Sequence, residues 1–468
     1  MRVTVTPAAT LPVTTAGIAQ MIRSLRDGGS GSGSDGGGSD VERITQIRLL
    51  ETLKSVASAA QAQLTAQFAL SREADLARIA TESVRDKARR DIGAQIGLAR
   101  RVNPRVGARL VGLAAVLTRE MPHLLGALRH GLVDEYQATL VAGETAGLSR
   151  EHRQVVDAEL SARFGTMTPA QARGAAARIG YRLDPEQAVR RIRKAHGDRC
   201  VTLRPAPDTM TYLTALLPVA DGVAAYAALT RHAASATAVG DPRGKGALMA
   251  DELVARVVRS SRSTACPSTE SGVSHDADEA HETASAGGNV EPSSTLTDGL
   301  SAVPAGVNIE IQLVMTDRTL LDGDMEPAIL TGYGPIPAPL ARHLVRGADP
   351  HTRTWVRRLY ADAGTGRLTG ADTRRRSFSH TARQLLIARD QVCRTPWCGA
   401  PIQHADHTRP HAAGGPTAIT NGAGRCAACN QIKEQPGWTT ETDADGGILV
   451  STPTGHRYRS RPPDAPWS

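Results

Sequence analysis

Apolar residues recur every three or four positions through the first half of the chain, with polar residues between them. The repeat begins at Val41, Ile44, Ile47, Leu50, Leu53 and Val56. This spacing places the apolar side chains on one face of an α-helix. Ala-rich runs with the same period continue to about Arg259, and X-Pro pairs such as Asn103-Pro104 interrupt them. Because proline starts or ends helices, we predict that residues 41–259 form an array of helices, an all-α N-terminal domain.

Two segments lack any apolar period, and we expect neither of them to pack into a core. Residues 28–39 read GGSGSGSDGGGS, which is typical of a linker, so residues 1–40 are predicted to form a flexible arm. Residues 260–304 are rich in Ser, Thr, Ala, Gly and acidic residues. A segment of this composition buries too little apolar surface to fold, so we predict a disordered acidic linker between two halves of the chain.

The pattern changes again after the acidic linker. Apolar and polar residues alternate from Val307 to Gln312, which predicts a strand over residues 307–314. A turn is indicated at residues 332–335, and residues 340–345 are predicted to form a short helix. We interpret residues 305–385 as a small mixed α/β connecting region that contains an Arg-rich stretch.

The composition adds two constraints. Hydrophobic residues make up 40% of the 468 residues but aromatic residues only 3%, so a core of Ala, Leu, Val and Ile is expected, which favours helices. The N-terminus lacks the apolar stretch of a secretory signal, and no run of about 18 apolar residues follows. We therefore expect a cytoplasmic protein with no membrane partner.

Positive charge is concentrated in one part of the chain. The net charge is +8, and residues 351–400 contain ten Arg and no Lys against three Asp. Such an excess favours a polyanionic partner, because arginines bind backbone phosphates without reading sequence. An ordinary solvated surface is the alternative. We predict DNA contacts at Arg374, Arg375, Arg376, Arg389, Arg409 and Lys433.

Four of the six cysteines lie in one short window. Cys393 and Cys398 have four residues between them, and Cys426 and Cys429 have two, which is a spacing typical of zinc sites. In a reducing compartment this grouping indicates metal binding rather than disulfides. We predict structural Zn2+ on the four thiolates; unligated buried cysteines and disulfides are the alternatives.

Polar residues of another kind lie between and after the two cysteine pairs. Asp406, His407 and Asn421 lie between the pairs, and Asn430 and Lys433 follow the second one. The spacing predicts two short strands joined through a glycine turn and then a helix, a ββα unit clamped by zinc. Adjacent residues of a regular strand face opposite sides, so Asp406 and His407 can serve one site only at a strand end or a bulge.

These polar residues suit metal-assisted hydrolysis. Asp406 and Asn430 offer the oxygen ligands that Mg2+ or another divalent ion prefers. His407 is left off the metal and can take a proton from an attacking water; an ordinary structural histidine is the alternative. The ion would stabilise the charge that develops on a phosphate and on the leaving oxygen.

The segment resembles the HNH endonuclease motif, in the variant with Asn at the third position. Asp406-His407, Asn421 and Asn430 match its three signature elements. The resemblance implies that His407 is the general base and that Asn421 positions the loop that carries it. It also implies that Asp406 and Asn430 hold the divalent ion.

A wider resemblance covers the chain from about residue 41. It is similar to the 13E12-repeat family of HNH proteins, whose N-terminal region is a helical domain of unknown function labelled DUF222. The stretches that carry this resemblance are residues 128–132, 332–335, 389–393, 433–438 and 454–458.

We therefore predict an α+β chain with an all-α accessory domain, an acidic linker, a zinc-stabilised ββα nuclease domain at residues 386–440 and a tail at residues 441–468. The predicted function is metal-dependent hydrolysis of DNA by an HNH endonuclease, with no small-molecule cofactor. A symmetric double-strand cut would require a homodimer. The alternatives are a zinc-containing DNA-binding module without cleavage, and a helical interaction protein with a relic nuclease unit.

Overall fold

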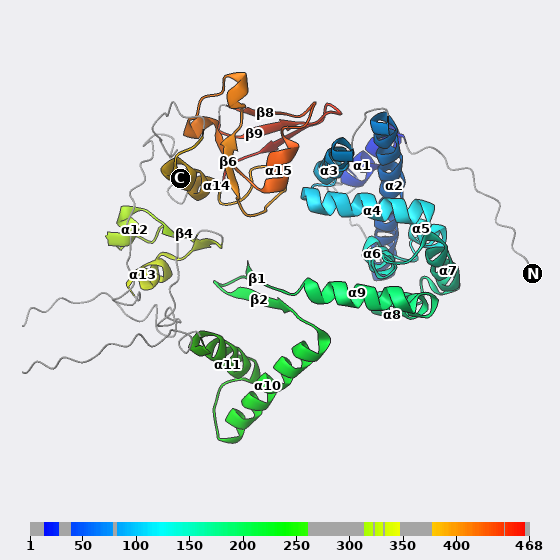
Figure 1. The fold of residues 1–468 in the computed structure, drawn as a ribbon, viewed down its shortest axis with the longest axis horizontal. Coiled ribbons are helices and arrows are strands. Elements are labelled where there is room, and N and C mark those ends of the chain that lie inside the picture. Colours follow the sequence, from blue (N-terminus) through cyan, green and yellow to red (C-terminus); the bar gives the residue numbers. More distant parts are fainter. Residues whose placement is uncertain are drawn as a thin grey trace, which may run out of the picture. The chain divides into compact units, whose positions relative to one another are not determined.

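The computed structural model describes residues 14–27, 39–77, 82–260, 313–321, 323–330, 333–346, 377–443 and 445–463. The chain divides into two compact units, residues 1–193 and 194–468, and each is described by itself (Figure 1). Apart from Ser260, the predicted acidic linker lies outside the described residues, as do Arg374, Arg375 and Arg376. None of the described helices has the length and the apolar composition that crossing a membrane requires.

The first unit is a bundle of helices, as the apolar period predicts. Its helices are α1 (Thr15–Asp27), α2 (Asp40–Ala77), α3 (Glu82–Ala99), α4 (Pro104–Arg119), α5 (Pro122–Arg129), α6 (Glu135–Glu144), α7 (Arg150–Leu160), α8 (Pro169–Leu183) and α9 (Pro185–Gly197), which passes the boundary. Four of them begin at a proline, where the missing N–H has no partner to lose. The side chains of Asn103 and Thr168 cap α4 and α8.

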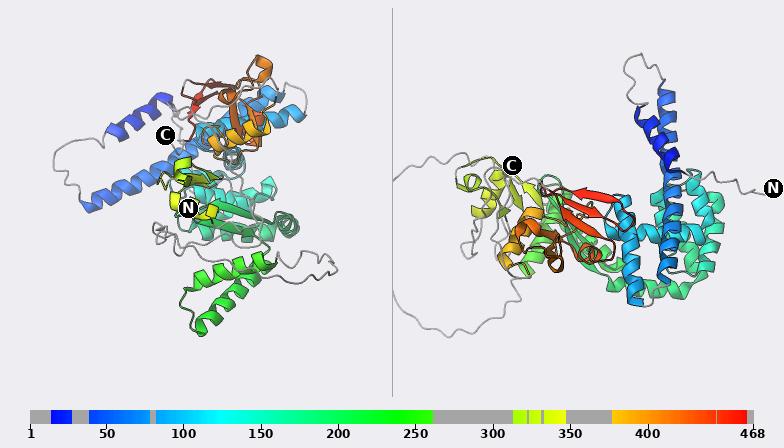
Figure 2. Two further views of the ribbon diagram at one scale, coloured as in Figure 1. Left: turned by 90° about the vertical axis from the view of Figure 1, so that its left-hand side faces the viewer. Right: turned by 90° about the horizontal axis from the view of Figure 1, so that it is seen from above.

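The core of this unit consists of small and aliphatic side chains from α2 and from α4 to α8. It includes Ala59, Ala62, Leu117, Met121, Leu124, Leu128, Val141, Val156 and Leu160. The first half of α2 is mostly exposed and extends beyond helices α3 to α8, with α1 beside it (Figure 2). Helix α1 lies within the segment predicted to be a flexible arm. That prediction missed the helical spacing of Ile18, Ile22 and Leu25, which are exposed.

Helices α3 and α4 cross with their backbones in contact. A Cβ atom added at Gly107 of α4 would lie 2.0 Å from the carbonyl oxygen of Gly93 and 2.6 Å from the nitrogen of Gly97, both in α3. No side chain fits in that space. The crossing therefore depends on glycine at position 107, whose lack of a side chain lets the two helices approach.

Gly107→Ala is expected to destabilise the first unit by about 2 kcal/mol, because the added methyl group forces the helices apart. Gly112→Ala is the matched control in the same helix. It has no atom within 4 Å of the added Cβ, so the higher helix propensity of alanine should raise stability by about 0.5–1 kcal/mol. Urea unfolding followed by helical circular dichroism measures both variants. Equal midpoints for the two would contradict the tight crossing.

The second unit begins with a feature that the sequence did not predict. Strands β1 (Cys200–Pro205) and β2 (Thr211–Leu216) form an antiparallel hairpin, in which Cys200 pairs with Leu216. The prediction of helices alone over residues 41–259 was wrong here. Every residue of both strands is exposed, so neither face of the hairpin is buried. Helices α10 (Val219–Ala238) and α11 (Lys245–Ser260) follow and contact each other.

A small antiparallel sheet lies after the undescribed segment. Its strands, in the order β3-β4-β5, are β3 (Leu313–Val314), β4 (Ala328–Leu330) and β5 (Gly334–Ile336). Helices α12 (Asp317–Leu321) and α13 (Ala338–Arg346) accompany it. The predicted helix at residues 340–345 is confirmed as part of α13, and only the last two residues of the predicted strand at 307–314 lie in the described part.

The C-terminal part contains the cysteines. Its elements are α14 (His380–Asp390), β6 (His404–His407), β7 (Gly422–Arg425), α15 (Ala427–Ile432), β8 (Thr439–Thr442), β9 (Ile448–Ser451) and β10 (Arg457–Ser460). Strands β6 and β7 are antiparallel and α15 follows them directly, so the order is ββα. The region predicted as a tail instead forms an antiparallel sheet in the order β10-β9-β8, whose inward side chains include Ile448 and Val450.

Candidate metal centre and active site

The four clustered cysteines come together around one point. Cys393 and Cys398 lie on the loop after α14, Cys426 caps the N-terminus of α15, and Cys429 lies in its first turn. Their sulfur atoms all lie within 4.8 Å of one another, and the Cys398 sulfur is 3.8 Å from that of Cys426 and 3.6 Å from that of Cys429. Four sulfurs bound tetrahedrally at about 2.3 Å would be about 3.8 Å apart. The cluster can therefore hold a metal such as zinc.

The cysteines are buried thiols, and none of them forms a disulfide. Hydrogen bonds from the sulfhydryl groups of Cys398, Cys426 and Cys429 lower the pKa of Cys393 far below its usual range. The first proton is thus lost easily, and a bound metal would favour loss of the others because the thiolate is the metal ligand.

Two arginines next to the cysteine pairs are buried. Arg394 follows Cys393 and is 3% exposed, and Arg425 precedes Cys426 and is 1% exposed. Burial lowers the pKa of the Arg394 guanidinium, which donates to the carboxylate of Asp390 at 2.9 Å. Buried cations need compensating negative charge. Four thiolates around a divalent ion carry excess negative charge, so the surroundings of the cysteines fit a metal–thiolate centre.

Arg389, which the sequence suggested as a DNA contact, is used within the protein. Its guanidinium donates to both carboxylate oxygens of Asp390, at 2.7 and 2.9 Å, and to the carbonyl oxygens of Ile419 (2.9 Å) and Gly422 (2.7 Å). These bonds fasten the end of α14 to the β6–β7 unit. A guanidinium held by four protein acceptors has little left to offer a phosphate, so we withdraw Arg389 as a DNA contact.

Asp406 and His407 lie at the end of β6. His407 is the last residue of the strand and pairs with Gly422. The Asp406 side chain turns toward its neighbour, because its Oδ1 accepts the His407 backbone N–H at 2.7 Å and lies 3.5 Å from His407 Nδ1. The two side chains thus face one region at a strand end. Phe378 packs on the His407 ring at 4.7 Å between centroids.

The far nitrogen of the His407 ring is bound by a residue that the sequence did not single out. Nε2 lies 2.9 Å from the hydroxyl of Thr417. When Nε2 carries the hydrogen and donates to Thr417, Nδ1 is the nitrogen that is free to accept a proton. A lone threonine carries no spacing signal, so only the fold reveals this contact.

Asn421 ties together the loop between β6 and β7. Its Oδ1 accepts the N–H of Arg409 at 2.9 Å, and its Nδ2 donates to the carbonyl oxygens of Arg409 (3.0 Å) and Pro416 (2.8 Å). Gly415 is packed so closely that a Cβ would lie 2.0 Å from the Arg409 carbonyl oxygen. These contacts fix the backbone that follows His407. The Arg409 side chain remains exposed.

Asn430 and Lys433 lie about one turn apart at the end of α15, which contacts β6. Lys433, 5% exposed in its side chain, places its Nζ 3.1 Å from Asp406 Oδ2 and also contacts Glu434. It is therefore withdrawn as a DNA contact, because it is buried and its charge is paired. Burial alone would raise the pKa of Asp406, but the charge of Lys433 and the hydrogen bond from His407 lower it.

Asn430 provides the test of whether a divalent ion fits. Its Oδ1 is buried and has no hydrogen-bond donor, and it lies on the same side of α15 as the lysine that reaches Asp406. A buried carbonyl oxygen without a donor is a ligand type that a hard cation prefers, as is the carboxylate of Asp406. The chemistry of these two oxygen donors therefore suits a divalent ion.

Asp406 and His407 open onto a surface cleft of about 320 Å³. Phe378, Arg383 and His404 also line it. Arg383 donates one N–H to the carbonyl oxygen of Gln403 at 3.1 Å and is exposed, so it places a positive charge on the wall. Arg383 had only an indirect signal in the sequence, since it belongs to the Arg-rich window at residues 351–400.

Comparison with known proteins places much of the chain in one family. The family model "Domain of unknown function (DUF222)" matches residues 51–390, which is well over half of the chain. No solved structure matches the chain.

Two relatives from Mycobacterium tuberculosis (strain ATCC 25618 / H37Rv) are themselves named as uncharacterized. Uncharacterized protein Rv3776 is 30% identical over 138 residues, which is 29% of this chain and 24% of the relative. Uncharacterized protein Rv2100 is 32% identical over 137 residues, 29% of this chain and 23% of the relative. The match thus covers about a quarter of each relative. On the strength of the family model, the chain belongs to the DUF222 family.

Proposed function

We propose that the chain is a metal-dependent endonuclease of the HNH type that hydrolyses phosphodiester bonds in DNA. One observation carries this proposal. The ββα unit brings Asp406 and His407 together at a strand end that opens on a cleft, and Asn421 fixes the loop that follows them. The four-cysteine cluster lies at the base of the same unit and supports it.

Each side chain of the site has a separate role in the proposed hydrolysis. His407 accepts a proton from the attacking water at Nδ1, in the tautomer whose Nε2 carries the hydrogen, and Nε2 lies 2.9 Å from the Thr417 hydroxyl. Asp406 and Asn430 would hold a divalent ion such as Mg2+, which when bound stabilises negative charge on the phosphate and the leaving oxygen. Arg383 and Arg409 are exposed and can bind the phosphates of the strand.

Nicking of supercoiled plasmid by zinc-loaded protein tests the proposal. Open circles should form when Mg2+ or Mn2+ is added and should not form without a divalent ion. Elemental analysis of the same sample establishes that zinc is present. If DNA is bound and no strand is broken under any ion, the proposed activity is wrong.

Thr417→Val tests the role of the threonine in orienting the base. An ordinary hydrogen bond contributes about 1 kcal/mol, so the nicking rate should fall about five- to tenfold with little change in zinc content. Thr420→Val is the matched control, because Thr420 is exposed and lies in the same loop. Equal rates for both variants would remove Thr417 from the site.

A second candidate function, a zinc-containing DNA-binding module without cleavage, is favoured by one contact. The ammonium of Lys433 lies 3.1 Å from Asp406 Oδ2, where it competes with a metal for the carboxylate. Retention of DNA without metal-stimulated nicking would support this candidate. Lys433→Gln separates the two, because loss of the lysine charge should lower the Mg2+ concentration needed by a true nuclease.

A further inference from the structure

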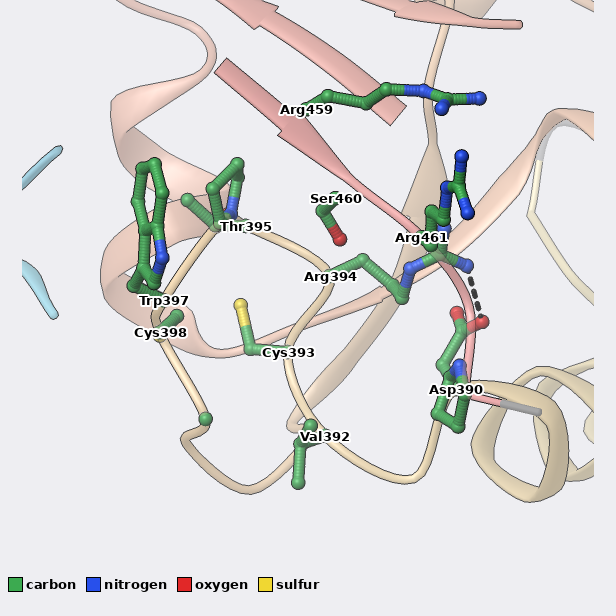
Figure 3. A pocket seen from close by; sticks show the side chains of 13 residues that line it. Asp390, Val392, Cys393, Arg394, Thr395, Trp397, Cys398, Arg459, Ser460 and Arg461 are labelled. Carbon is green, nitrogen blue, oxygen red and sulfur yellow. Dashed lines mark hydrogen bonds and ion pairs between the residues drawn. The ribbon is translucent and has the colours of Figure 1, made fainter. Parts of the chain in front are cut away.

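A second cleft, of about 250 Å³, shares no lining residue with the cleft at Asp406 and His407. It lies between the loop of the first cysteine pair and the end of β10 (Figure 3). Arg394 and Trp397 line it from the loop, and Ser460 and Arg461 line it from the end of β10 and the residue after it; the guanidinium of Arg459 is already paired with Asp443 and Asp445.

A buried guanidinium with an unused donor lies in this cleft. Arg394 donates to Asp390 Oδ1 at 2.9 Å and to the carbonyl oxygen of Gly446 at 3.0 Å, but its Nε has no hydrogen-bond partner. Figure 3 shows its side chain crossing the cleft, with the Ser460 hydroxyl directed toward it. A buried donor without an acceptor is costly, and an acceptor group on a ligand would satisfy it.

The charges around this donor favour an anion. Among the described residues that line the cleft, Asp390 is the only acidic one, and its carboxylate is already bound by Arg389, by Arg394 and by the backbone N–H of Gly424. Arg461 is exposed and forms no ion pair with a described carboxylate. Arg394 and Arg461 both line the cleft, so a phosphate bound there would meet positive charge from both side chains.

A flat aromatic ring lies at the same cleft. Trp397 is 45% exposed although it is large and apolar. The ring of Tyr458 holds it edge to face, with centroids 5.7 Å apart and planes at 79°, so its position is defined by packing. An exposed indole on one side of the cleft and two arginines on the other (Figure 3) match the two parts of a nucleotide, a base that stacks and a phosphate that accepts hydrogen bonds.

We propose that this cleft binds one nucleotide of a single-stranded DNA segment, with its phosphate on Arg394 and Arg461 and its base on Trp397. The inference rests on the proposed function only in taking DNA as the polymer. It does not require cleavage, and it assigns a contact away from Asp406 and His407. The cleft would hold a strand end or an unpaired nucleotide beside the cysteine cluster.

Binding of a fluorescent oligothymidine of about 12 nucleotides tests the phosphate contact. Zinc-loaded full-length protein is titrated without added magnesium, and fluorescence anisotropy gives the Kd at several salt concentrations. Arg461→Gln should weaken binding about three- to tenfold and reduce the salt slope by about one. Arg457→Gln removes the same charge four residues earlier, in β10 and outside the cleft, and should weaken binding by about twofold or less. Equal effects of the two variants would overturn the proposal.

The stacking contact is tested with a second oligonucleotide that lacks bases. Trp397→Ala should weaken oligothymidine binding on the order of tenfold, and it should cause no further loss with the abasic strand. The same loss on both strands would exclude stacking. If Trp397→Ala does not retain zinc, the proposal is judged from the Arg461→Gln variant alone, because Arg461 is exposed.

A thymidine mononucleotide that bound as tightly as the oligonucleotide would assign the cleft to a free nucleotide and overturn the strand assignment. If the oligonucleotides bind as expected but the protein does not nick plasmid, the proposed nuclease activity is wrong and the proposed nucleotide cleft is unaffected.

Discussion

Cys429→Ser is expected to abolish metal binding and unfold the ββα segment. Metal binding at four-thiolate sites has an apparent free energy of about 10–16 kcal/mol, which matches or exceeds the whole stability of a small domain, about 5–15 kcal/mol. Cys429 is buried and its sulfur lies 3.6 Å from that of Cys398, so a serine there removes one of the converging ligands. Elemental analysis should show loss of zinc, and limited proteolysis should cut within residues 393–443.

Cys200→Ser is the matched control for this experiment. Cys200 is an exposed free thiol in β1, away from the cluster. The zinc content and protease resistance of the Cys200→Ser protein should equal those of the unaltered chain. A Cys429→Ser protein with a full complement of zinc and unchanged protease resistance would show that the cluster is not a metal centre. The helical signal of the first unit should survive in both variants, because its core contains none of these residues.

His407→Ala is expected to reduce DNA nicking on the order of a thousandfold, because general acid–base catalysis contributes about 10²–10⁴ in rate. The ring is buried and packs on Phe378, so the variant also loses packing. Zinc content and thermal melting must therefore be measured on the same sample. Retention of zinc with loss of nicking assigns the effect to chemistry.

His411→Ala separates the base from its neighbour. Its ring lies 5.8 Å from that of His407, but His411 is exposed on a short turn. We expect most of the nicking activity to remain in this variant. A larger loss in His411→Ala than in His407→Ala would reverse the assignment of the base, and full activity in both would remove histidine from the mechanism.

Short-range patterns predicted the elements that depend on local chemistry. The proline breaks at Pro104, Pro122, Pro169 and Pro185 coincide with helix starts, because proline fits the first turn of a helix and not its interior, whereas Pro242 lies between α10 and α11. The grouping of the four cysteines is confirmed, since ligand pairs with two and four residues between them can converge wherever the fold brings the pairs together. The hairpin β1–β2 was missed although Val201 and Leu203 alternate with Thr202 and Arg204, because this alternation is short and lies between long Ala-rich runs of helical period.

Contacts between distant segments could not be predicted in this way. Arg394 and Arg425 are among the most buried side chains of the C-terminal part, yet arginines usually lie at the surface. Arg389 lies in an Arg-rich window that suggests DNA, but the backbone carbonyls that bind it come from residues thirty positions later. The charge pattern along the sequence therefore indicated that the region carries a positive net charge. It did not indicate which arginines are bound by acceptors within the protein.

The placement of the cysteine pairs has a consequence for a broken chain. One pair precedes β6 and the other follows β7, so the loop at residues 408–421 lies between the two halves of the cluster. A peptide bond cut in that loop would leave two fragments that share one metal and one strand pairing. The segment thus has the layout of a split protein, whose halves associate when zinc is present and separate when a chelator removes it.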